Sequence, residues 1–292
     1  MSKSIAITGS SGMIGTFLKN YFENLGYSVY PISKEVLTDS ESLKKILLLS
    51  DVIINLAGEN IGTGRWSYFK KKRIYESRIY TTKQIVRVLN EEAMPPKTFI
   101  SISAIGYYGY DCGKISSEDA PVGNDFLATV CKDWEKAAGE YRKGRLIIPR
   151  LGIVLSKEGG FLKKMEKLAN YYILSPLGDG KKRASWIAIE DVASLILFLI
   201  EHSQMQGPIN FTTPNDFTNE EFVSTLYGKI RKKALFPMPE WLVKVIFGKK
   251  GKILLLSDQM VHSSKLASSS YIFKYKTLKE YLNSNVLYQK RN

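Results

Sequence analysis

Three glycines near the amino terminus form the clearest chemical motif of the chain. They belong to the run Gly9-Ser10-Ser11-Gly12-Met13-Ile14-Gly15, which follows a short apolar, β-prone segment at Ile5–Thr8. In this spacing the first glycine permits a tight turn, the second lets the backbone approach a pyrophosphate, and the third allows close helix packing. The N–H groups and positive dipole end of a following helix then hold phosphate groups. The motif predicts a dinucleotide-binding loop, with a tight turn that binds no ligand as the alternative.

The residues that follow the next expected strand bear on which dinucleotide is bound. Tyr27–Ile32 is expected to form this strand, and Ser33 and Lys34 come directly after it. An NAD-specific site usually has Asp or Glu here, because a carboxylate accepts hydrogen bonds from the ribose 2′-hydroxyl. A hydroxyl and a cation instead suit a 2′-phosphate, which a carboxylate would repel. We therefore expect NADP(H) in preference to NAD(H), with recognition by Glu35 as the alternative.

These motifs require strands and helices that alternate along the first half of the chain. Apolar residues at helical spacing between Phe17 and Leu25, followed by Gly26, complete a β–α–β opening. The alternation continues through a helix at Leu43–Leu49, a strand at Asp51–Leu56, a helix at Tyr68–Glu91, a strand at Thr98–Ser103, a helix at Phe126–Tyr141 and a strand at Leu146–Leu155. This order predicts an α/β fold with a Rossmann-like, doubly wound parallel sheet.

The regular alternation weakens after Gly159 and Gly160. The remaining expected elements are helices at Phe161–Tyr172, Ile189–His202, Thr218–Arg231 and Trp241–Phe247, and a strand at Pro208–Thr212. We therefore expect a dinucleotide-binding domain over residues 1–155 and a smaller, more helical substrate or interaction part over residues 156–292. Later segments of the second part can return to the first.

The composition excludes several classes of protein. The 292 residues include 44% hydrophobic residues and only two cysteines, Cys112 and Cys131, whose spacing fits neither a disulfide framework nor a metal site. No apolar run reaches the length of a membrane span. The net charge of +14 comes from basic residues spread along the chain, without the motifs of a nucleic-acid-binding module. We expect a cytoplasmic protein that binds no metal or membrane, with nucleic-acid binding kept as the minority alternative; its oligomeric state stays open.

Further motifs occur in order along nearly the whole chain. They are Thr8–Gly15, Ile54–Ile61 (INLAGENI), Arg65-Trp66, Ser77-Arg78, Gly106–Gly109 (GYYG), Asp125–Leu127, Trp134-Glu135, Gly178–Gly180, Trp186-Ile187 and Thr218–Phe222 (TNEEF). Together they resemble the short-chain dehydrogenase/reductase superfamily. More narrowly, they are similar to its atypical extended "epimerase family" branch, related to NAD-dependent epimerases and dehydratases. That branch has a C-terminal domain of unknown function, which would begin here at about residue 240.

The resemblance implies where the parts of NADP(H) would bind. Ser33 and Lys34 would meet the phosphate on the adenosine ribose, and Leu56, Ala57 and Gly58 would line the adenine and ribose side. Arg73 and Arg78 would lie near anionic groups of the cofactor, and Val154 near its nicotinamide half. The two arginines are five residues apart, so they do not share one helix face closely, and a solvated Arg73 is the alternative.

The superfamily's usual acid–base pair is missing. That chemistry needs Tyr-x-x-x-Lys on one helix face, where a cation lowers the tyrosine pKa and the phenol passes a proton. The corresponding positions here are Leu127 and Cys131, and neither can do this work. Ser103 can fill the place of the serine that polarises the substrate oxygen.

Two tyrosines could supply the missing proton. Tyr107 and Tyr108 lie in the loop after Ser103 and are the candidate proton donors; a packing role for both is the alternative. A basic loop at Lys181–Arg183 would suit an anionic substrate, and solvated lysines explain it equally well.

Two functions fit these observations. The first is an NADP(H)-dependent oxidoreductase or epimerase that acts on a small polar substrate with atypical catalytic residues. The second is a non-catalytic, regulatory or redox-sensing protein that binds NADP(H). The intact glycine loop and Ser103 favour the enzyme, whereas Leu127 and Cys131 favour the sensor.

Overall fold

A parallel β-sheet forms the centre of the molecule. The structure is a computed structural model that describes residues 3–94, 96–110, 115–202, 204–230, 239 and 257–284. The main strands are β1 (Ser4–Thr8), β2 (Ser28–Ile32), β3 (Val52–Asn55), β4 (Thr98–Ser101), β6 (Arg145–Leu151) and β10 (Gly207–Phe211). They lie in the order β10-β6-β4-β3-β1-β2, and the short β5 (Ser103–Ala104) also pairs with β6. All of these pairings are parallel.

The burial of the strands explains their composition. Every residue of β1, β3 and β4 is buried, as expected for central parallel strands that are covered on both faces. Strand β2 forms the edge of the sheet, is only partly buried and carries Pro31. An edge strand tolerates proline because the missing N–H is not needed for pairing on its outer side.

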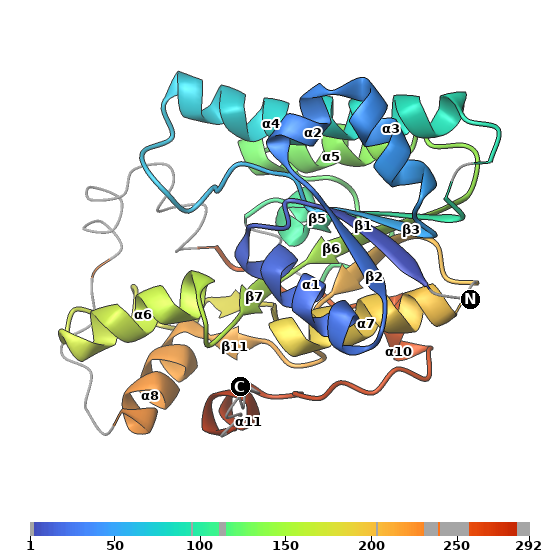
Figure 1. The fold of residues 1–292 in the computed structure, drawn as a ribbon. Coiled ribbons are helices and arrows are strands. Elements are labelled where there is room, and N and C mark those ends of the chain that lie inside the picture. Colours follow the sequence, from blue (N-terminus) through green and yellow to red (C-terminus); the bar gives the residue numbers. More distant parts are fainter. Residues whose placement is uncertain are drawn as a thin grey trace.

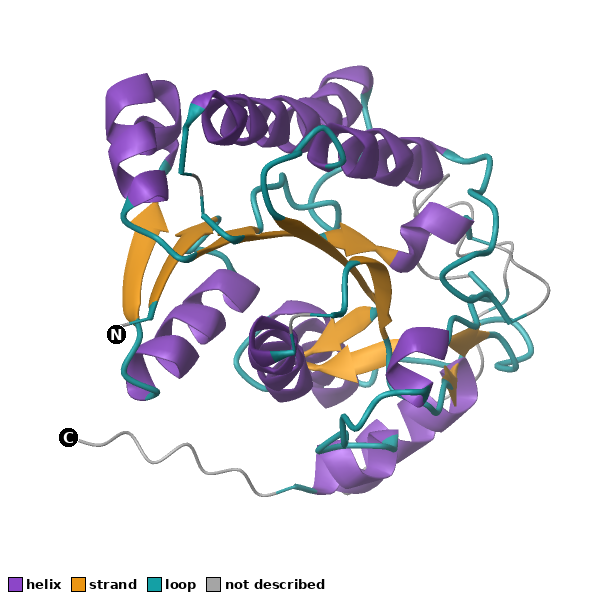
Figure 2. Cartoon of the chain, turned by 90° about the vertical axis from the view of Figure 1, so that its right-hand side faces the viewer, coloured by secondary structure: helices purple, strands orange, loops and turns teal. Residues whose placement is uncertain are grey.

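Helices cover both faces of this sheet. Helices α1 (Met13–Asn24) and α7 (Ile189–Glu201) lie on one face, and α3 (Ser40–Leu48), α4 (Tyr68–Glu91) and α5 (Phe126–Ala138) lie on the other (Figures 1 and 2). A three-layer arrangement of this kind is the Rossmann-like α/β fold. The fold class expected from the sequence is therefore confirmed, and α4 has the same bounds as predicted.

The strand order defines where a ligand can bind. Strand β1 lies between β2 and β3, so the chain winds outward in opposite directions from this point. Ligands of open α/β sheets bind beyond the carboxyl ends of the strands at such a reversal. The glycine loop after β1 and the residues Leu56–Gly58 after β3 meet at this edge.

One expected strand is broken into two. The segment predicted as a single strand at Leu146–Leu155 forms β6 in the main sheet and β7 (Ile153–Leu155), which pairs with β9 (Trp186–Ala188) instead. The break falls at Gly152, where a side-chain carbon would lie 2.9 Å from the Ser185 carbonyl oxygen. This close approach lets the chain leave the main sheet.

The ends of several other expected elements were wrong by a few residues. The strand expected at Thr98–Ser103 is interrupted between β4 and β5, and the helix expected to reach Tyr141 ends at Ala138, before Gly139. A short helix α2 (Lys34–Thr38) begins immediately after β2 and was not expected. The helix expected at Trp241–Phe247 lies outside the described residues.

The later part of the chain has a core of its own. Helices α6 (Gly160–Asn170), α8 (Asn219–Lys229) and α11 (Leu278–Asn283) pack around the buried rings of Trp186, Phe217 and Tyr281. Strand β10 nevertheless belongs to the main sheet, beside β6. Residues 207–211 of the predicted second part thus return to the sheet of the first.

A buried carboxylate fastens the C-terminal segment to α7. Asp191 is fully buried in the first turn of this helix. Its carboxylate accepts hydrogen bonds from the Tyr271 hydroxyl (2.9 Å) and from the backbone N–H groups of Lys274 (2.7 Å) and Tyr275 (3.1 Å). Burial raises the pKa of Asp191, and these hydrogen bonds counteract part of that shift.

We expect Asp191→Asn to loosen the C-terminal segment. The amide would point an N–H donor at a backbone N–H donor, which should lower the free energy of unfolding by about 2 kcal/mol. Urea unfolding monitored by tryptophan fluorescence would measure the loss, and limited proteolysis would locate it beyond residue 257. The exposed Asp179, whose carboxylate accepts the Lys181 N–H, provides the matched control Asp179→Asn. Equal unfolding midpoints for the two variants would contradict the assignment.

Candidate functional site

The glycine loop closes tightly against the neighbouring strand. Gly9 has a positive φ of 65°, which favours glycine, and a side-chain carbon there would lie 2.9 Å from the Leu56 carbonyl oxygen. At Gly15 such a carbon would lie 2.3 Å from the Gly9 carbonyl oxygen. Gly15 is therefore required because the backbone of the loop itself leaves no room for a side chain. The sequence motif had suggested a different reason, the packing of the helix on the sheet. Both glycines bring the start of α1 close to the ends of β1 and β3.

The start of α1 is suited to bind an anion. Gly12 is its N-cap residue and offers no side chain to the first N–H groups, and the first turn contains no acidic residue. The first N–H groups of a helix have no partner within the helix, and the helix dipole is positive at this end. The loop at Gly9–Gly15 therefore keeps backbone donors for a phosphate group.

A buried polar network, not expected from the sequence, holds the two strand ends in register. The Thr8 hydroxyl donates to Asn55 Oδ1 (2.7 Å) and accepts the backbone N–H groups of Leu56 (3.1 Å) and Ala57 (3.2 Å). Asn55 Nδ2 in turn donates to the Thr82 hydroxyl on α4 (2.8 Å). Two polar residues at the ends of otherwise apolar strands were the signal in the sequence. The network sets the position of Leu56–Gly58 beside the glycine loop.

Arg78 lies directly against Gly58. A side-chain carbon on Gly58 would lie 2.8 Å from Arg78 Cζ. Arg78 Nη1 donates to the carbonyl oxygens of Glu59 (3.1 Å) and Ile74 (3.0 Å), and the guanidinium lies 5.2 Å from the centre of the Trp134 ring. Within the described residues its Nε and Nη2 form no hydrogen bond. Burial lowers the pKa of Arg78, so this is a desolvated cation with donors to spare.

Two exposed cations, predicted to lie near anionic groups of the cofactor, act electrostatically on one carboxylate. Lys34 begins α2, where the Ser33 hydroxyl accepts the Val36 N–H (3.4 Å), and Arg73 lies on α4. A hydrogen bond from Lys70 lowers the pKa of Glu59, and the charges of Lys70, Arg73 and Lys34 lower it further. Positive charges from two separate elements, α2 and α4, thus act on Glu59.

The remaining cofactor candidate lies on the other side of the site. Val154 belongs to β7 and is partly buried against the main core. Beyond β7, a side-chain carbon on Gly160 would lie 2.6 Å from the sulfur of Met13. The connection from β7 to α6 therefore contacts the glycine loop. The binding roles assigned to these residues stay predictions.

Ser103 takes part in a buried ion pair. Its hydroxyl donates to Glu135 Oε1 (2.7 Å), and Ser103 is almost fully buried. Arg150 binds both oxygens of the same carboxylate, through Nε (2.8 Å) and Nη2 (2.7 Å). Burial alone would lower the pKa of Arg150, but the contacts with Glu135 raise it overall. In this arrangement the Ser103 proton points to Glu135 and not to a substrate oxygen.

Both candidate tyrosines contact the same arginine. The Tyr108 hydroxyl donates to Asn210 Oδ1 (2.7 Å) and accepts from Arg150 Nη1 (2.7 Å), and burial raises the Tyr108 pKa to about 12. The Tyr107 ring stacks on the Arg150 guanidinium, 3.6 Å from Cζ to the ring centre. Tyr108 is buried, whereas Tyr107 is only partly so. The geometry therefore favours packing for Tyr108, and a catalytic role for either tyrosine stays a prediction.

The two residues that replace the missing acid–base pair, Leu127 and Cys131, lie close to the loop that follows Ser103. A side-chain carbon on Gly106 would lie 3.5 Å from Leu127 Cβ and 3.7 Å from Cys131 Sγ. Helix α5 thus presents residues 127 and 131 to the loop after Ser103. Burial, followed by the negative charge of Glu135, raises the pKa of Cys131 to about 12. The helix has the geometry for the chemistry but not the side chains.

A serine, an aspartate and a histidine also meet elsewhere. Asp216 accepts a hydrogen bond from the Ser185 hydroxyl, and its second oxygen lies 3.2 Å from His262 Nε2. A nucleophilic triad needs the histidine between the serine and the carboxylate, and here the carboxylate lies between them. Among the residues that the structure describes, no three His, Cys, Asp or Glu side chains gather as a metal site would require.

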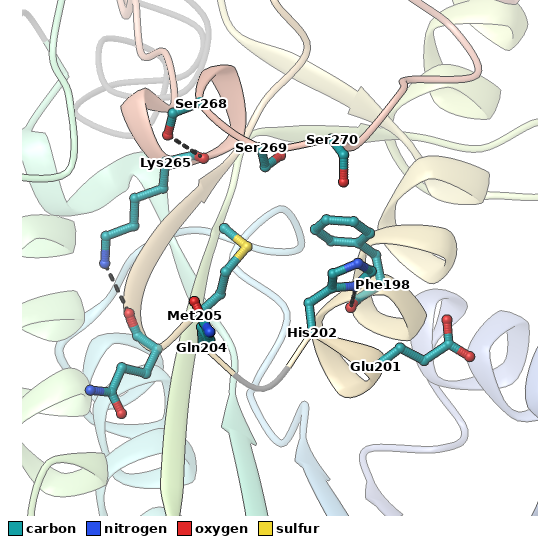
Figure 3. Close-up of a pocket in the computed structure, with 10 residues that line it drawn as sticks. Phe198, Glu201, His202, Gln204, Met205, Lys265, Ser268, Ser269 and Ser270 are labelled. Atoms are coloured by element: carbon teal, nitrogen blue, oxygen red, sulfur yellow. Dashed lines mark hydrogen bonds between the residues drawn. The ribbon is translucent and has the colours of Figure 1, made fainter.

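A cavity of about 730 Å³ lies at the opposite edge of the sheet (Figure 3). Its wall includes His202, stacked on Phe198, and Lys265, which donates to the Gln206 carbonyl oxygen (2.9 Å). Glu201 at its rim pairs with Lys3, which precedes β1 (3.8 Å). The cavity therefore adjoins the amino end of β1 and lies away from the glycine loop.

Comparison with known proteins decides the family. A model of the NAD dependent epimerase/dehydratase family matches residues 5–211, and a domain of unknown function, DUF1731, matches residues 238–284. The chain belongs to the NAD dependent epimerase/dehydratase family. The resemblance drawn from the sequence motifs is confirmed. In the described part of this epimerase-family chain, no helix is long and apolar enough to cross a membrane.

Relatives match over nearly the whole length. An epimerase family protein of Mycobacterium leprae is 32% identical over 291 residues, which cover 96% of this chain and 94% of that protein. The crystal structure of human epimerase family protein SDR39U1 with NADPH has a TM-score of 0.87 and 27% identity, covering 96% and 97% of the two chains. A nucleoside-diphosphate sugar epimerase from Corynebacterium glutamicum has a TM-score of 0.77 and 28% identity, covering 96% and 57%.

We expect the Cys131 thiol of this epimerase-family protein to be unreactive in the folded state. An ordinary thiol with a pKa of about 8.5 is largely thiolate at about pH 9 and is alkylated quickly. With its pKa raised to about 12, Cys131 should resist iodoacetamide at that pH and react once urea unfolds the protein. Peptide mass spectrometry would follow residue 131 separately from Cys112. Rapid native alkylation would reopen the possibility that Cys131 is a nucleophile.

Proposed function

We propose that the chain binds NADP(H) at the carboxyl edge of the sheet and acts as an oxidoreductase or epimerase on a small polar substrate, with atypical catalytic residues. The main structural support for this cofactor site is the environment of Arg78. It is a partly buried, desolvated guanidinium with spare donors, and it lies against Gly58 at the point where the strand order reverses. A desolvated cation of this kind is stabilised by an anionic ligand.

The residues around this edge fit a dinucleotide phosphate. The uncapped start of α1 would hold the pyrophosphate, and Lys34 and Arg73 would meet the 2′-phosphate. Human SDR39U1, which has the same fold at 27% identity, was crystallised with NADPH, and this supports the assignment. When bound, the nicotinamide supplies or accepts a hydride. The chain's own residues must orient the substrate and move the proton.

The proton is the unusual part of the proposal. Leu127 cannot carry one, and Cys131 stays protonated because its pKa is raised to about 12. Ser103 could turn its hydroxyl toward a substrate oxygen, because Arg150 would still neutralise Glu135. Tyr107, partly exposed beside Arg150, is the proton donor that we favour, and the basic loop at Lys181–Arg183 would suit an anionic substrate.

We propose the cytoplasm as the compartment of this protein, since Cys131 is a free thiol.

A second function is favoured by the same polar contacts. The Ser103 hydroxyl is committed to Glu135, and no acid–base pair faces it from α5. A protein with these features could bind NADP(H) without turnover and report its redox state to a partner. We therefore propose an NADP(H) sensor as the alternative.

We expect the purified protein to bind NADPH at least about tenfold more tightly than NADH, about 1.4 kcal/mol in favour of the 2′-phosphate. Lys34→Glu should abolish this preference, because it replaces an attractive charge with a repulsive one. Titration followed by nicotinamide fluorescence measures both affinities. Lys45→Glu on α3 makes the same charge change away from the site and should leave the ratio unchanged. If the folded protein binds neither cofactor, the proposed function is wrong.

We expect bound NADPH to lose its hydride to one member of a panel of carbonyl compounds and nucleotide sugars. Ser103→Ala should slow this loss by about a hundredfold or more without weakening NADPH binding, since Ser103 would act on the substrate. Absorbance at the NADPH band reports the reaction. No turnover with any compound, together with partner capture that differs between the NADP⁺ and NADPH forms, would favour the sensor instead.

A further inference from the structure

A lysine is buried beside the proposed adenosine phosphate site. Lys70 lies in the first turn of α4 and is 6% exposed, although lysine side chains are almost never buried unless they are paired. Its ammonium donates to Glu59 Oε1 and to the Thr63 hydroxyl (3.3 Å). The Glu59 side chain is 33% exposed and that of Lys70 is 8% exposed. The ammonium is therefore the more buried partner of the pair, and the carboxylate keeps partial access to solvent.

Glu59 is held at this place by three contacts with α4. Its backbone N–H donates to the Ser77 hydroxyl (2.9 Å), its carbonyl oxygen accepts from Arg78 Nη1 (3.1 Å), and its carboxylate accepts from Lys70. The residue directly follows Gly58, against which Arg78 lies. Glu59 cannot move away from the cofactor edge without breaking these contacts.

A fixed carboxylate is a disadvantage next to a phosphate. Hydrogen bonding by Lys70 lowers the Glu59 pKa, so the group is ionised at neutral pH. Lys34 and Arg73 act electrostatically on the same carboxylate, yet neither forms an ion pair with an acidic residue in the described part of the chain. An unpaired Glu59 would attract these two cations and repel a 2′-phosphate.

We propose that Lys70 sets the preference for NADP(H) over NAD(H) through its ion pair with Glu59. It neutralises Glu59 on its buried side, so that Lys34 and Arg73 stay available for the 2′-phosphate of NADP(H). Lys70 is thus a positioning residue: it does not touch the cofactor but determines the charge that the cofactor meets. The inference rests on the proposed NADP(H) site and adds a residue that neither the glycine loop nor the end of β2 reveals.

The test compares NADPH with NADH, which differ only in the 2′-phosphate. Lys70→Met should weaken NADPH binding by about five- to tenfold and NADH binding by less than about twofold, as expected for one uncompensated charge near a phosphate. Adding Glu59→Gln to Lys70→Met should restore the NADPH affinity, because no carboxylate is then left to neutralise. Lys70→Arg should keep the wild-type ratio.

Lys72→Met is the matched control on the same helix. Lys72 is exposed and pairs with Glu76 (3.7 Å) instead of Glu59, so its loss should leave both affinities unchanged. Should Lys70→Met fail to fold, Glu59→Gln alone remains a test, since it should leave NADPH affinity equal or higher. Lower NADPH affinity in Glu59→Gln would overturn the inference.

The failures of the two proposals are distinguishable. Equal weakening of NADPH and NADH in Lys70→Met, or no rescue by Glu59→Gln, would make the ion pair merely structural and leave the cofactor site intact. A wild-type protein that binds neither cofactor, or prefers NADH, would overturn the proposed NADP(H) site itself, before any variant is measured.

Discussion

The arrangement of the site depends on one buried ion pair, between Arg150 in β6 and Glu135 in α5. Arg150 is 2% exposed in a strand of the central sheet, and a charge there is tolerated only when it is paired and hydrogen-bonded. Both carboxylate oxygens of Glu135 accept hydrogen bonds from Arg150. The third guanidinium nitrogen, Nη1, donates to the carbonyl oxygen of Glu118 (3.0 Å) and to the Tyr108 hydroxyl. Truncating either partner would leave an uncompensated charge in the core. Helix α5 is therefore fixed on the sheet at the level of Ser103.

The same network reaches into the C-terminal segment. From Tyr108 it continues through Asn210 to the Glu118 carboxylate, which accepts the Asn210 N–H (3.0 Å), the Ser263 hydroxyl, and both the N–H (2.9 Å) and the hydroxyl (2.8 Å) of Ser264. Burial alone would raise the Glu118 pKa, but these donors lower it on balance. Segments from both predicted domains thus share one set of polar contacts.

Local patterns predicted the elements well, and contacts between distant residues account for what was missed. The helix at Tyr68–Glu91 and the glycine loop follow from spacing within a few turns of chain, so the sequence alone was sufficient. The break at Gly152 depends on the Ser185 carbonyl, and the pairing of Lys70 with Glu59 depends on how α4 returns over the end of β3. Ser103 could be recognised from the sequence as a candidate. Its commitment to Glu135 could not, because the two residues meet only when α5 packs on the sheet.

The ion pair also limits what chemistry the site can perform. A hydrogen bond to a charged group contributes about 1.5–3 kcal/mol, so turning the Ser103 hydroxyl toward a substrate has a modest cost that substrate binding can offset. Arg150 would keep Glu135 neutralised during that turn. No comparable adjustment is open to Cys131, because ionising a buried thiol beside Glu135 places two negative charges together in the core. Substrate polarisation is therefore retained as an option in this fold, while proton transfer from α5 is lost. We therefore propose that turnover takes its proton from the loop that carries Tyr107 or from water that enters with the substrate.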